Sequence, residues 1–262
     1  MKIILDTGTA DPDDILTIAY LAEKGLLSAV TLYPGSDAQV GLVKTILRDL
    51  GLKIPVGGNS AKATKDFVSP FYSKVFKYVP EQPDAQAKDI IKDQLTNGAR
   101  ILTCEAPFNL DGLDITEWNA QGGYCPPELM DPSQVLEKFK DVKVCQSFNF
   151  GSPSLIDRVI AKSQKRTFVS KNVCHGVKYD KTIHSRTKDG MIKRIMDVYL
   201  RDHAEKAFHD LLAASCLFDR DICQFKEVEM YHDKNLWGCF EKTGSNTFIS
   251  VGVDKERFWS TL

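Results

Sequence analysis

Four aspartates crowd into nine residues near the N-terminus. Asp6, Asp11, Asp13 and Asp14 all lie in LDTGTADPDD, residues 5–14, directly after a short apolar run. In open α/β sheets, ligands bind outside the carboxyl ends of the strands, which is where this loop would lie. One or two of these aspartates could cap a following helix. Four carboxylates exceed that need and would repel one another, so the loop predicts a site for a hard cation or a polar ligand.

Three further positions could contribute to the same chemistry. His209 and Asp210 open the apolar run FHDLLAA, Asn149 follows a strand in SFNFG, and Phe108 lies in APFN at another strand end. Each has an ordinary alternative, because His-Asp can cap a helix and Asn is common in turns. None of the three is specific on its own.

The elements that would position these residues begin with a β-α-β-α-β pattern. Apolar spacing predicts a strand over 3–5, a helix from 15 to 25, a strand over 26–33, a helix over 37–51 and a strand over 53–59. This alternation is typical of a largely parallel sheet covered by helices. The first loop therefore leaves the first strand of an α/β fold.

The remaining chain continues strands and helices without a convincing linker, so we expect a single domain over 1–262. Residues 61–83 and 111–134 are rich in loop-forming residues and predict two long loops. The other expected elements are a helix over 84–98, a strand from 99, a strand from 142, a helix over 154–164, a strand from 166, a helical region over roughly 190–218, antiparallel strands in 227–253 and a last helix in 255–262.

Composition narrows the classes of partner. The chain has 262 residues, a formal net charge of −1 and 43% hydrophobic residues. It has no basic surplus that would point to nucleic acid and no long apolar run that would point to a membrane. The seven cysteines form no CxxC pair, which is typical of reduced thiols, and we expect a cytoplasmic protein.

The order of these motifs resembles the nucleoside hydrolase family, the inosine-uridine preferring type of metal-dependent N-ribohydrolases. The likeness runs from IILDTGTADPDD through APFN, SFNF and FHDLLAA to ISVGVDKERFWSTL. It implies a nucleoside hydrolase-like α/β fold: an open, mostly parallel sheet flanked by helices around a Rossmann-like core, with extra antiparallel strands near the C-terminus. It also implies a nucleoside-like small-molecule substrate and a possible homodimer or tetramer.

The resemblance further implies a hydrolase in which a water bound to Ca²⁺, with Mg²⁺ possible, attacks C1′ of a nucleoside or related N-riboside. A loop aspartate would deprotonate that water, and His209, with an ordinary pKa near 6.5, could protonate the leaving base. The implied metal ligands are Asp6, Asp14, a carbonyl near Phe108, and Asp210. The implied catalytic residues are Asp11, Asp13 and His209, and the expected substrate-binding residues are Asp13, Ser36, Ser147, Asn149 and Asn172.

Three positions depart from the family pattern. Gly8 stands where the family has a second aspartate that acts as base and metal ligand, which leaves Asp11 as the spare carboxylate. Ser36 stands near where the family has an asparagine. Ser147 replaces an acidic residue at the sugar, which favours a substrate with a larger 5′ substituent. Two alternatives follow: a non-catalytic nucleoside- or sugar-binding relative, or a haloacid dehalogenase-type phosphatase, whose second aspartate would also fall at Gly8.

Overall fold

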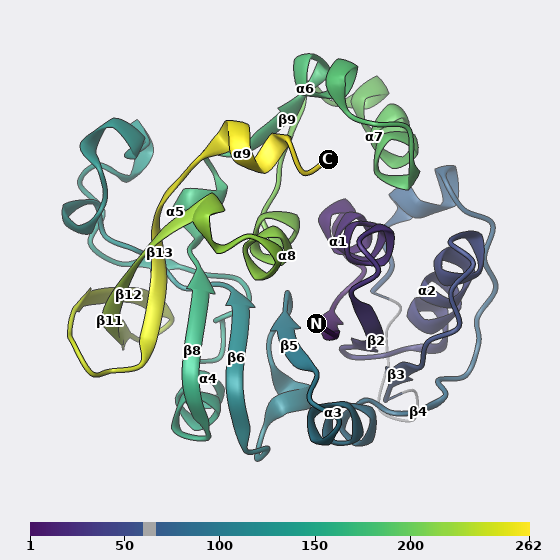
Figure 1. The fold of residues 1–262 in the computed structure, drawn as a ribbon, viewed down its shortest axis with the longest axis horizontal. Helices are drawn as coiled ribbons and strands as arrows, with labels where there is room; N and C mark the ends of the chain where they lie inside the picture. The colour runs from purple at the N-terminus through teal and green to yellow at the C-terminus, as the bar shows by residue number, and fades with distance from the viewer. Residues whose placement is uncertain (60–66) are drawn as a thin grey trace.

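A computed structural model describes residues 1–59 and 67–262, and its centre is one eleven-stranded sheet (Figure 1). The predicted loop over 61–83 therefore lies partly outside the described residues. The strands of this sheet are β1 (Ile3–Thr7), β2 (Leu27–Leu32), β3 (Val56–Gly58), β4 (Ala85–Gln86), β5 (Arg100–Thr103), β6 (Ile115–Gln121), β7 (Cys145–Gln146), β8 (Ser163–Val169), β11 (Cys223–Asp233), β12 (Leu236–Glu241) and β13 (Thr247–Val253).

The strand order is β4-β3-β2-β1-β5-β6-β8-β13-β11-β12-β7. All pairs from β4 to β13 are parallel, whereas β11, β12 and β7 add antiparallel pairs at one edge. The chain leaves β1 toward β2 on one side and returns to β5 on the other. The carboxyl ends of β1 and β5 therefore border a topological switch point, the usual ligand position in such sheets. The predicted fold class is confirmed.

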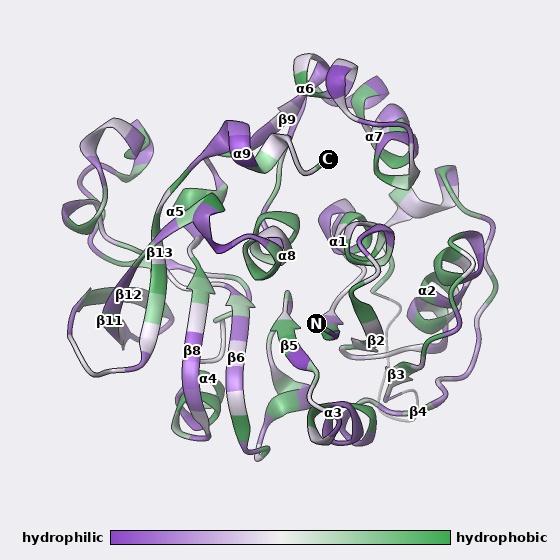
Figure 2. Ribbon diagram, in the orientation of Figure 1, coloured by the Kyte–Doolittle hydropathy of each residue, from purple (hydrophilic) through white to green (hydrophobic). Residues whose placement is uncertain are grey.

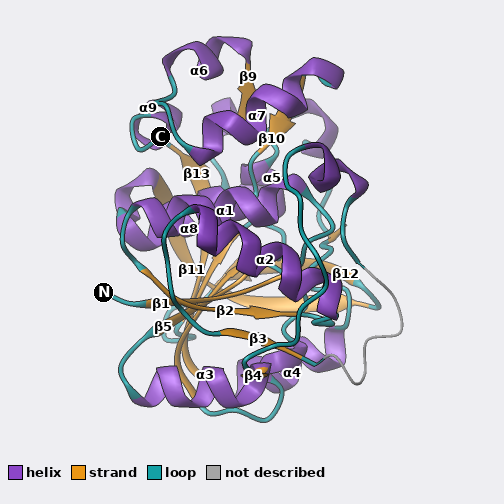
Figure 3. Ribbon diagram, turned by 90° about the vertical axis from the view of Figure 1, so that its right-hand side faces the viewer, coloured by secondary structure: helices purple, strands orange, loops and turns teal. Residues whose placement is uncertain are grey.

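Helices cover both faces of the sheet. The helices are α1 (Pro12–Glu23), α2 (Asp37–Asp49), α3 (Ala87–Thr96), α4 (Pro153–Ala161), α5 (Lys171–Cys174), α6 (Lys181–Arg186), α7 (Met191–Asp202), α8 (Asp210–Phe218) and α9 (Lys255–Trp259). In the side view, α1, α2 and α8 lie above the sheet, and α3 and α4 lie below it (Figure 3). None of the helices in the described part of the chain is long and apolar enough to cross a membrane.

Helix α8 occupies the middle of the upper layer. It packs against α1 and against the sheet at β6 and β8. Its residues Leu211–Cys216 are all buried, and the helix is coloured largely hydrophobic (Figure 2). A helix that is apolar on all sides is stable only when it is covered on all sides. The first turns of α1 and α8 are thus held together above the carboxyl ends of β1 and β5.

Three predicted elements are corrected. The predicted loop over 111–134 contains β6, a full strand between β5 and β8, because its polar residues hid the strand pattern. The predicted helical region over 190–218 is α7 and α8 separated by β10 (Glu205–Ala207), which pairs antiparallel with β9 (Lys178–Asp180). The strand predicted from 142 is reduced to the two residues of β7 at the sheet edge.

Candidate active site

The crowded loop ends in the cap of α1. The Asp11 side chain accepts a hydrogen bond from Asp13 N at 2.9 Å, and the Asp14 side chain accepts one from Asp11 N at 3.0 Å. This reciprocal pair is a capping box, which satisfies donors that the first turn of a helix leaves unpaired. Asp14 Oδ1 also accepts a hydrogen bond from Thr7 Oγ1 at 3.1 Å. Capping therefore fixes where the carboxylates of Asp11 and Asp14 lie.

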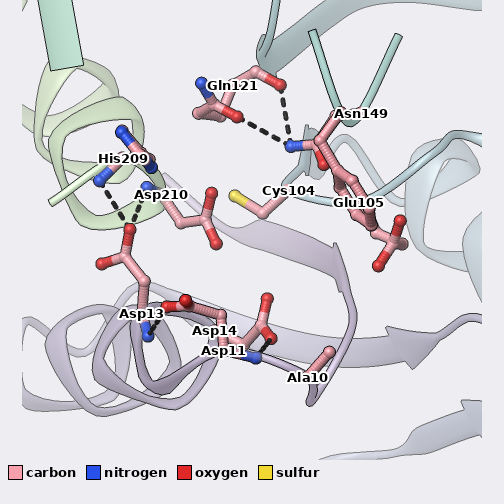
Figure 4. A pocket seen from close by; sticks show the side chains of 11 residues that line it. Ala10, Asp11, Asp13, Asp14, Cys104, Glu105, Gln121, Asn149, His209 and Asp210 are labelled. Carbon is pink, nitrogen blue, oxygen red and sulfur yellow. Dashed lines mark hydrogen bonds between the residues drawn. The ribbon is translucent and has the colours of Figure 1, made fainter. Parts of the chain in front are cut away.

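Asp13 ties α1 to the N-terminus of α8. Its Oδ2 accepts hydrogen bonds from His209 N at 2.5 Å and from Asp210 N at 2.8 Å (Figure 4). Backbone N–H groups at a helix N-terminus favour a negative partner. The other oxygen, Oδ1, is buried and has no hydrogen-bond partner among the described residues. Asp13 thus uses one oxygen to join the helices and keeps the other free.

These residues surround a cavity of about 360 Å³ at the switch point. Residues from five distant parts of the chain meet there, and Figure 4 shows residues from each of them. Six of the residues predicted from the sequence line it: Asp11, Asp13, Asp14, Asn149, His209 and Asp210. Asp11, Asp13 and Asp14 follow the parallel strand β1, whereas Asn149 follows β7 at the edge of the sheet, and His209 and Asp210 follow a strand that lies outside it.

Asp6 lies next to the cavity but does not line it. It is fully buried, and its Oδ1 accepts hydrogen bonds from Thr31 Oγ1 at 2.6 Å and from Asn109 Nδ2 at 2.8 Å. Its Oδ2 is buried without a partner among the described residues. A carboxylate oxygen that is buried and unpaired costs free energy unless another group satisfies it.

Three predicted substrate-binding residues form hydrogen bonds outside the cavity instead. The Ser36 side chain caps the N-terminus of α2. Ser147 Oγ accepts a hydrogen bond from Gly123 N at 3.0 Å. Asn172 bonds both backbone groups of Cys125, through its Oδ1 and its Nδ2. None of the three lines the cavity.

Phe108 belongs to a neighbouring pocket. Its carbonyl accepts a hydrogen bond from Asp111 N at 3.4 Å, and its ring stacks on Tyr33 with centroids 4.4 Å apart. Together with Phe67 and Phe148, these rings line a second cavity of about 420 Å³. The two cavities share Ala10, Glu105 and Phe148, so the polar site adjoins an aromatic one.

Among the lining residues that were not predicted from the sequence, two carry amide or carboxylate side chains. Gln121, at the end of the unpredicted strand β6, accepts a hydrogen bond from Asn149 Nδ2 at 2.8 Å and so orients that side chain. Glu105 follows β5 and lines both cavities. Their positions in the sheet could have identified both residues. Glu105 follows β5, which pairs with β1, and Gln121 ends β6, which pairs with β5.

Burial dominates the electrostatics of the aspartates. Desolvation raises the pKa of Asp6 to about 7, of Asp13 to about 6 and of Asp14 to about 8, and it raises the pKa of Asp210 well above its usual range. The charges of the neighbouring aspartates add to the shifts of Asp13, Asp14 and Asp210. Lys206 opposes the shift of Asp13 and pairs with Asp11 Oδ1 at 2.7 Å.

His209 differs from the expectation of an ordinary histidine. Burial, followed by the charge of Lys206, lowers its pKa to about 3, so the imidazole is neutral at physiological pH. Its Nε2 is buried without a partner among the described residues, and its ring lies edge-to-face against His175 with centroids 5.0 Å apart. A neutral imidazole can still donate one N–H, but it carries no positive charge.

The shifted aspartates predict how stability varies with pH when divalent cations are chelated. Asp6, Asp13 and Asp14 have folded pKa values of about 7, 6 and 8, above the unfolded value of 3.8. At a pH between the unfolded and the folded pKa of each group, the folded state therefore binds more protons than the unfolded state. The free energy of unfolding is therefore expected to fall as pH rises through this window. Lowered pKa values of His175 (about 4) and His209 (about 3) act in the opposite direction, but only below about 6.5.

Between pH 6.5 and 8 the aspartates thus act alone, and Asp14 by itself is expected to account for a fall of about 2 kcal/mol. Denaturant unfolding in EDTA at several pH values would measure it. Asp14→Asn should flatten the curve. A stability that rises over this range would contradict the prediction.

The donor chemistry of the site fits a hard divalent cation. Asp6 Oδ2 and Asp13 Oδ1 are buried oxygens without partners in the described chain, and Asp14 and Asp210 add two more buried carboxylates. Ca²⁺ and Mg²⁺ prefer such oxygen ligands. Within residues 1–59 and 67–262, however, no three acidic, imidazole or thiol side chains come close enough to enclose an ion in the present arrangement. Binding would therefore need the carboxylates to draw together.

The fold is shared with solved structures. No protein-family model matches the chain, and no curated protein matches its sequence. A plant nucleoside hydrolase, PpNRh1, superposes with a TM-score of 0.74 at 16% identity, over 99% of this chain and 97% of that one. A purine-preferring ribonucleoside hydrolase from Gardnerella vaginalis gives 0.72 at 17% identity, over 100% and 96%.

A third similar structure has a different description. The type III effector protein XopQ, solved in complex with adenosine diphosphate ribose, gives a TM-score of 0.58 at 13% identity, over 100% of this chain and 92% of that one. At these identities the likeness concerns the fold. The expected nucleoside hydrolase-like fold is therefore confirmed over the whole length of the chain.

Proposed function

We propose that this protein is a hydrolase that cleaves the N-glycosidic bond of a nucleoside or related N-riboside. The observation that carries the proposal is the convergence of Asp13, Asp14, Asp210, Asn149 and His209 on one cavity at the switch point of this fold. Cleavage passes through an oxocarbenium-like transition state, which nearby carboxylates stabilise. The cavity offers several carboxylates, and Lys206 pairs with one of them, Asp11.

Two side chains are suited to hold the sugar. Asp13 Oδ1 is free to accept a hydrogen bond from a ribose hydroxyl, while Oδ2 stays on the N-terminus of α8. Asn149 donates its Nδ2 to Gln121, which leaves its Oδ1 as an acceptor facing the cavity. These positions support the sugar-binding roles expected for Asp13 and Asn149.

Ca²⁺, or Mg²⁺, held among Asp14, Asp210 and Asp6 would orient the sugar diol and make a bound water more acidic. The buried unpaired oxygen of Asp6 supports its place in this set. The Phe108 carbonyl would have to exchange its contact with Asp111 to join it.

His209 is placed to donate a hydrogen bond to the departing base. His209→Ala is expected to slow release of a purine by about 10²-fold or more, because the imidazole N–H would stabilise the negative charge that develops on the departing purine. Cleavage of a nitrophenyl riboside, whose leaving group needs no proton, should change only a few-fold. Steady-state kinetics on both substrates measure the difference. An equal loss on both would remove His209 as the donor.

The experiment that tests the function combines a calcium titration with a nucleoside panel. Calcium binding would be followed by calorimetry and thermal shift, and released base by chromatography. The proposal expects both binding and release. Binding of a nucleoside without release of base would instead support a non-catalytic relative, and neither binding nor release would refute both.

One observation favours the non-catalytic alternative as a second candidate. Gly8 lacks the family's carboxylate, and the adjoining aromatic pocket around Tyr33, Phe108 and Phe148 could hold a second ring of a larger ligand. The ligand would then be an extended nucleoside, such as one with a 5′ substituent. The phosphatase alternative has no such support, because Gly8 also removes its second aspartate.

A further inference from the structure

A carboxylate lies beside Gly8, just beyond the end of the neighbouring strand β5. Strands β1 and β5 pair in parallel with Asp6 opposite Thr103, and Cys104 N donates to the Asp6 carbonyl at 2.8 Å. Two residues beyond this pair, Gly8 and Glu105 leave the sheet side by side. The first strand loses a side chain at the position where the adjacent strand supplies a carboxylate.

The two positions share the same space. A Cβ on Gly8 would lie 2.7 Å from Glu105 Oε2 and 3.6 Å from Asp14 Oδ2. The Glu105 carboxylate therefore reaches the volume that a side chain at position 8 would fill, and Asp14 borders the same volume. Glycine at position 8 is what leaves room for it.

The Glu105 carboxylate is available for a ligand. Its Oε1 accepts a hydrogen bond from the backbone N of Ala106 at 2.9 Å, and it has no ion-pair partner among the described residues. It lines both cavities. Its negative charge also acts on its neighbours, since it adds to the effect of burial in raising the pKa of Asp6 and Asp14.

Asp11, the other spare carboxylate, is already engaged. Its Oδ1 accepts hydrogen bonds from Asp13 N and pairs with Lys206 Nζ at 2.7 Å. Its side chain is 57% exposed, whereas that of Glu105 is half-buried. Asp11 is therefore committed to the cap of α1 and to its ion pair with Lys206.

We propose that Glu105, rather than Asp11, is the catalytic base that activates the attacking water, an assignment that rests on the proposed function. The water oxygen forms a bond to C1′ while a Glu105 oxygen takes its proton. The C1′–N bond breaks and its electron pair leaves with the base, which accepts a hydrogen bond from the neutral His209 and takes its proton from solvent. Glu105 then returns its proton to bulk water.

The first test compares isosteric substitutions. Glu105→Gln is expected to slow base release by about 10²–10⁴-fold, the usual contribution of a positioned general base. It should also weaken calcium binding about tenfold in calorimetry, because one negative charge beside Asp14 is lost. Glu117→Gln, a half-buried glutamate paired with Arg100 at the other end of β6, is the matched control. Asp11→Asn should lose at least tenfold less activity than Glu105→Gln.

The second test relocates the carboxylate. Gly8→Asp combined with Glu105→Ala should release base at least tenfold faster than Glu105→Ala alone and should recover calcium affinity. Gly8→Asn with Glu105→Ala, which restores volume without charge, should recover neither. Thermal melts would establish that each variant is folded, and Glu105→Gln alone decides the question if the double variants are not.

The outcomes separate this inference from the function on which it rests. A wild-type protein that neither binds calcium nor releases base refutes the proposed function, and the assignment of Glu105 falls with it. An active wild type whose Glu105→Gln variant keeps both its rate and its calcium affinity overturns only the role of Glu105. A larger loss in Asp11→Asn than in Glu105→Gln would assign the base to Asp11 instead.

Discussion

Asp210→Asn is expected to abolish calcium binding and to slow base release by at least about 10³-fold, or roughly 4 kcal/mol in the barrier. Asp210 is the first residue of α8, and its backbone N is already fixed by Asp13. Its carboxylate is buried, accepts no hydrogen bond from the described residues and points into the cavity beside Cys104 (Figure 4). Asparagine keeps the shape of the side chain but removes the charge that a divalent cation needs.

The same substitution should change stability in opposite directions with and without calcium. Burial and the charges of Asp13 and Asp14 raise the pKa of Asp210 well above its usual range. In the calcium-free protein at neutral pH, the Asp210 carboxyl group therefore lowers the free energy of unfolding. In EDTA, Asp210→Asn should therefore melt at a higher temperature than the wild type. In calcium the order should reverse, because only the wild type gains stability from binding.

Thermal melts of both proteins in EDTA and in millimolar calcium measure this reversal. Asp114→Asn, an exposed aspartate paired with Lys162 at 2.9 Å, is a control that should leave the calcium shift unchanged. A wild-type calcium shift in Asp210→Asn would show that Asp210 is not a ligand.

The sequence predicted those parts of the fold that rest on local periodicity. The first β-α-β-α-β units have apolar runs with clear period, and the helices and strands form close to where the spacing indicates. The five positions that converge, Asp13, Asp14, Asn149, His209 and Asp210, were predictable as a group. In a parallel sheet, the loops that follow the strands and the N-termini of the next helices lie at one edge, which accounts for Asp13 and Asp14. Asn149, His209 and Asp210 follow strands outside the parallel part, so only the family resemblance predicted that they join the site.

Other features depended on contacts between distant segments. Strand β6 was missed because Glu117 and Asn119 interrupt its apolar pattern, and the cavity residue Gln121 was missed with it. Ser147 and Asn172 are held by backbone groups that no sequence pattern places beside them. The low pKa of His209 likewise comes from burial by residues distant in the sequence.

Glu105 shows the same limit most clearly. When the first loop is compared with the family pattern, a carboxylate is missing at Gly8, and Asp11 is the nearest substitute within the loop. The register between β1 and β5 instead places Glu105 against Gly8. A function lost at one position of a sheet can be supplied by the adjacent strand, because neighbouring strands lie about 5 Å apart. Only the pairing of the strands reveals that exchange.

Asp13 allows the structural and chemical roles of one carboxylate to be separated. Asparagine can keep an oxygen on the N–H groups of His209 and Asp210 while its NH₂ replaces the unpaired Oδ1. Asp13→Asn should therefore keep a melting temperature close to that of the wild type. Its base release should fall by about 10²–10³-fold, because a ribose hydroxyl loses its acceptor and the transition state loses a negative charge.

Asp13→Ala removes both roles. Two N–H groups at the buried N-terminus of α8 then lose their acceptor, which should lower the free energy of unfolding by about 2 kcal/mol or more relative to Asp13→Asn. Denaturant unfolding and base release, measured on both variants at one pH, test the two roles together. Equal stability of the two variants would show that Asp13 does not hold α8 against α1. Wild-type activity in Asp13→Asn would show that its free oxygen does not contact the sugar.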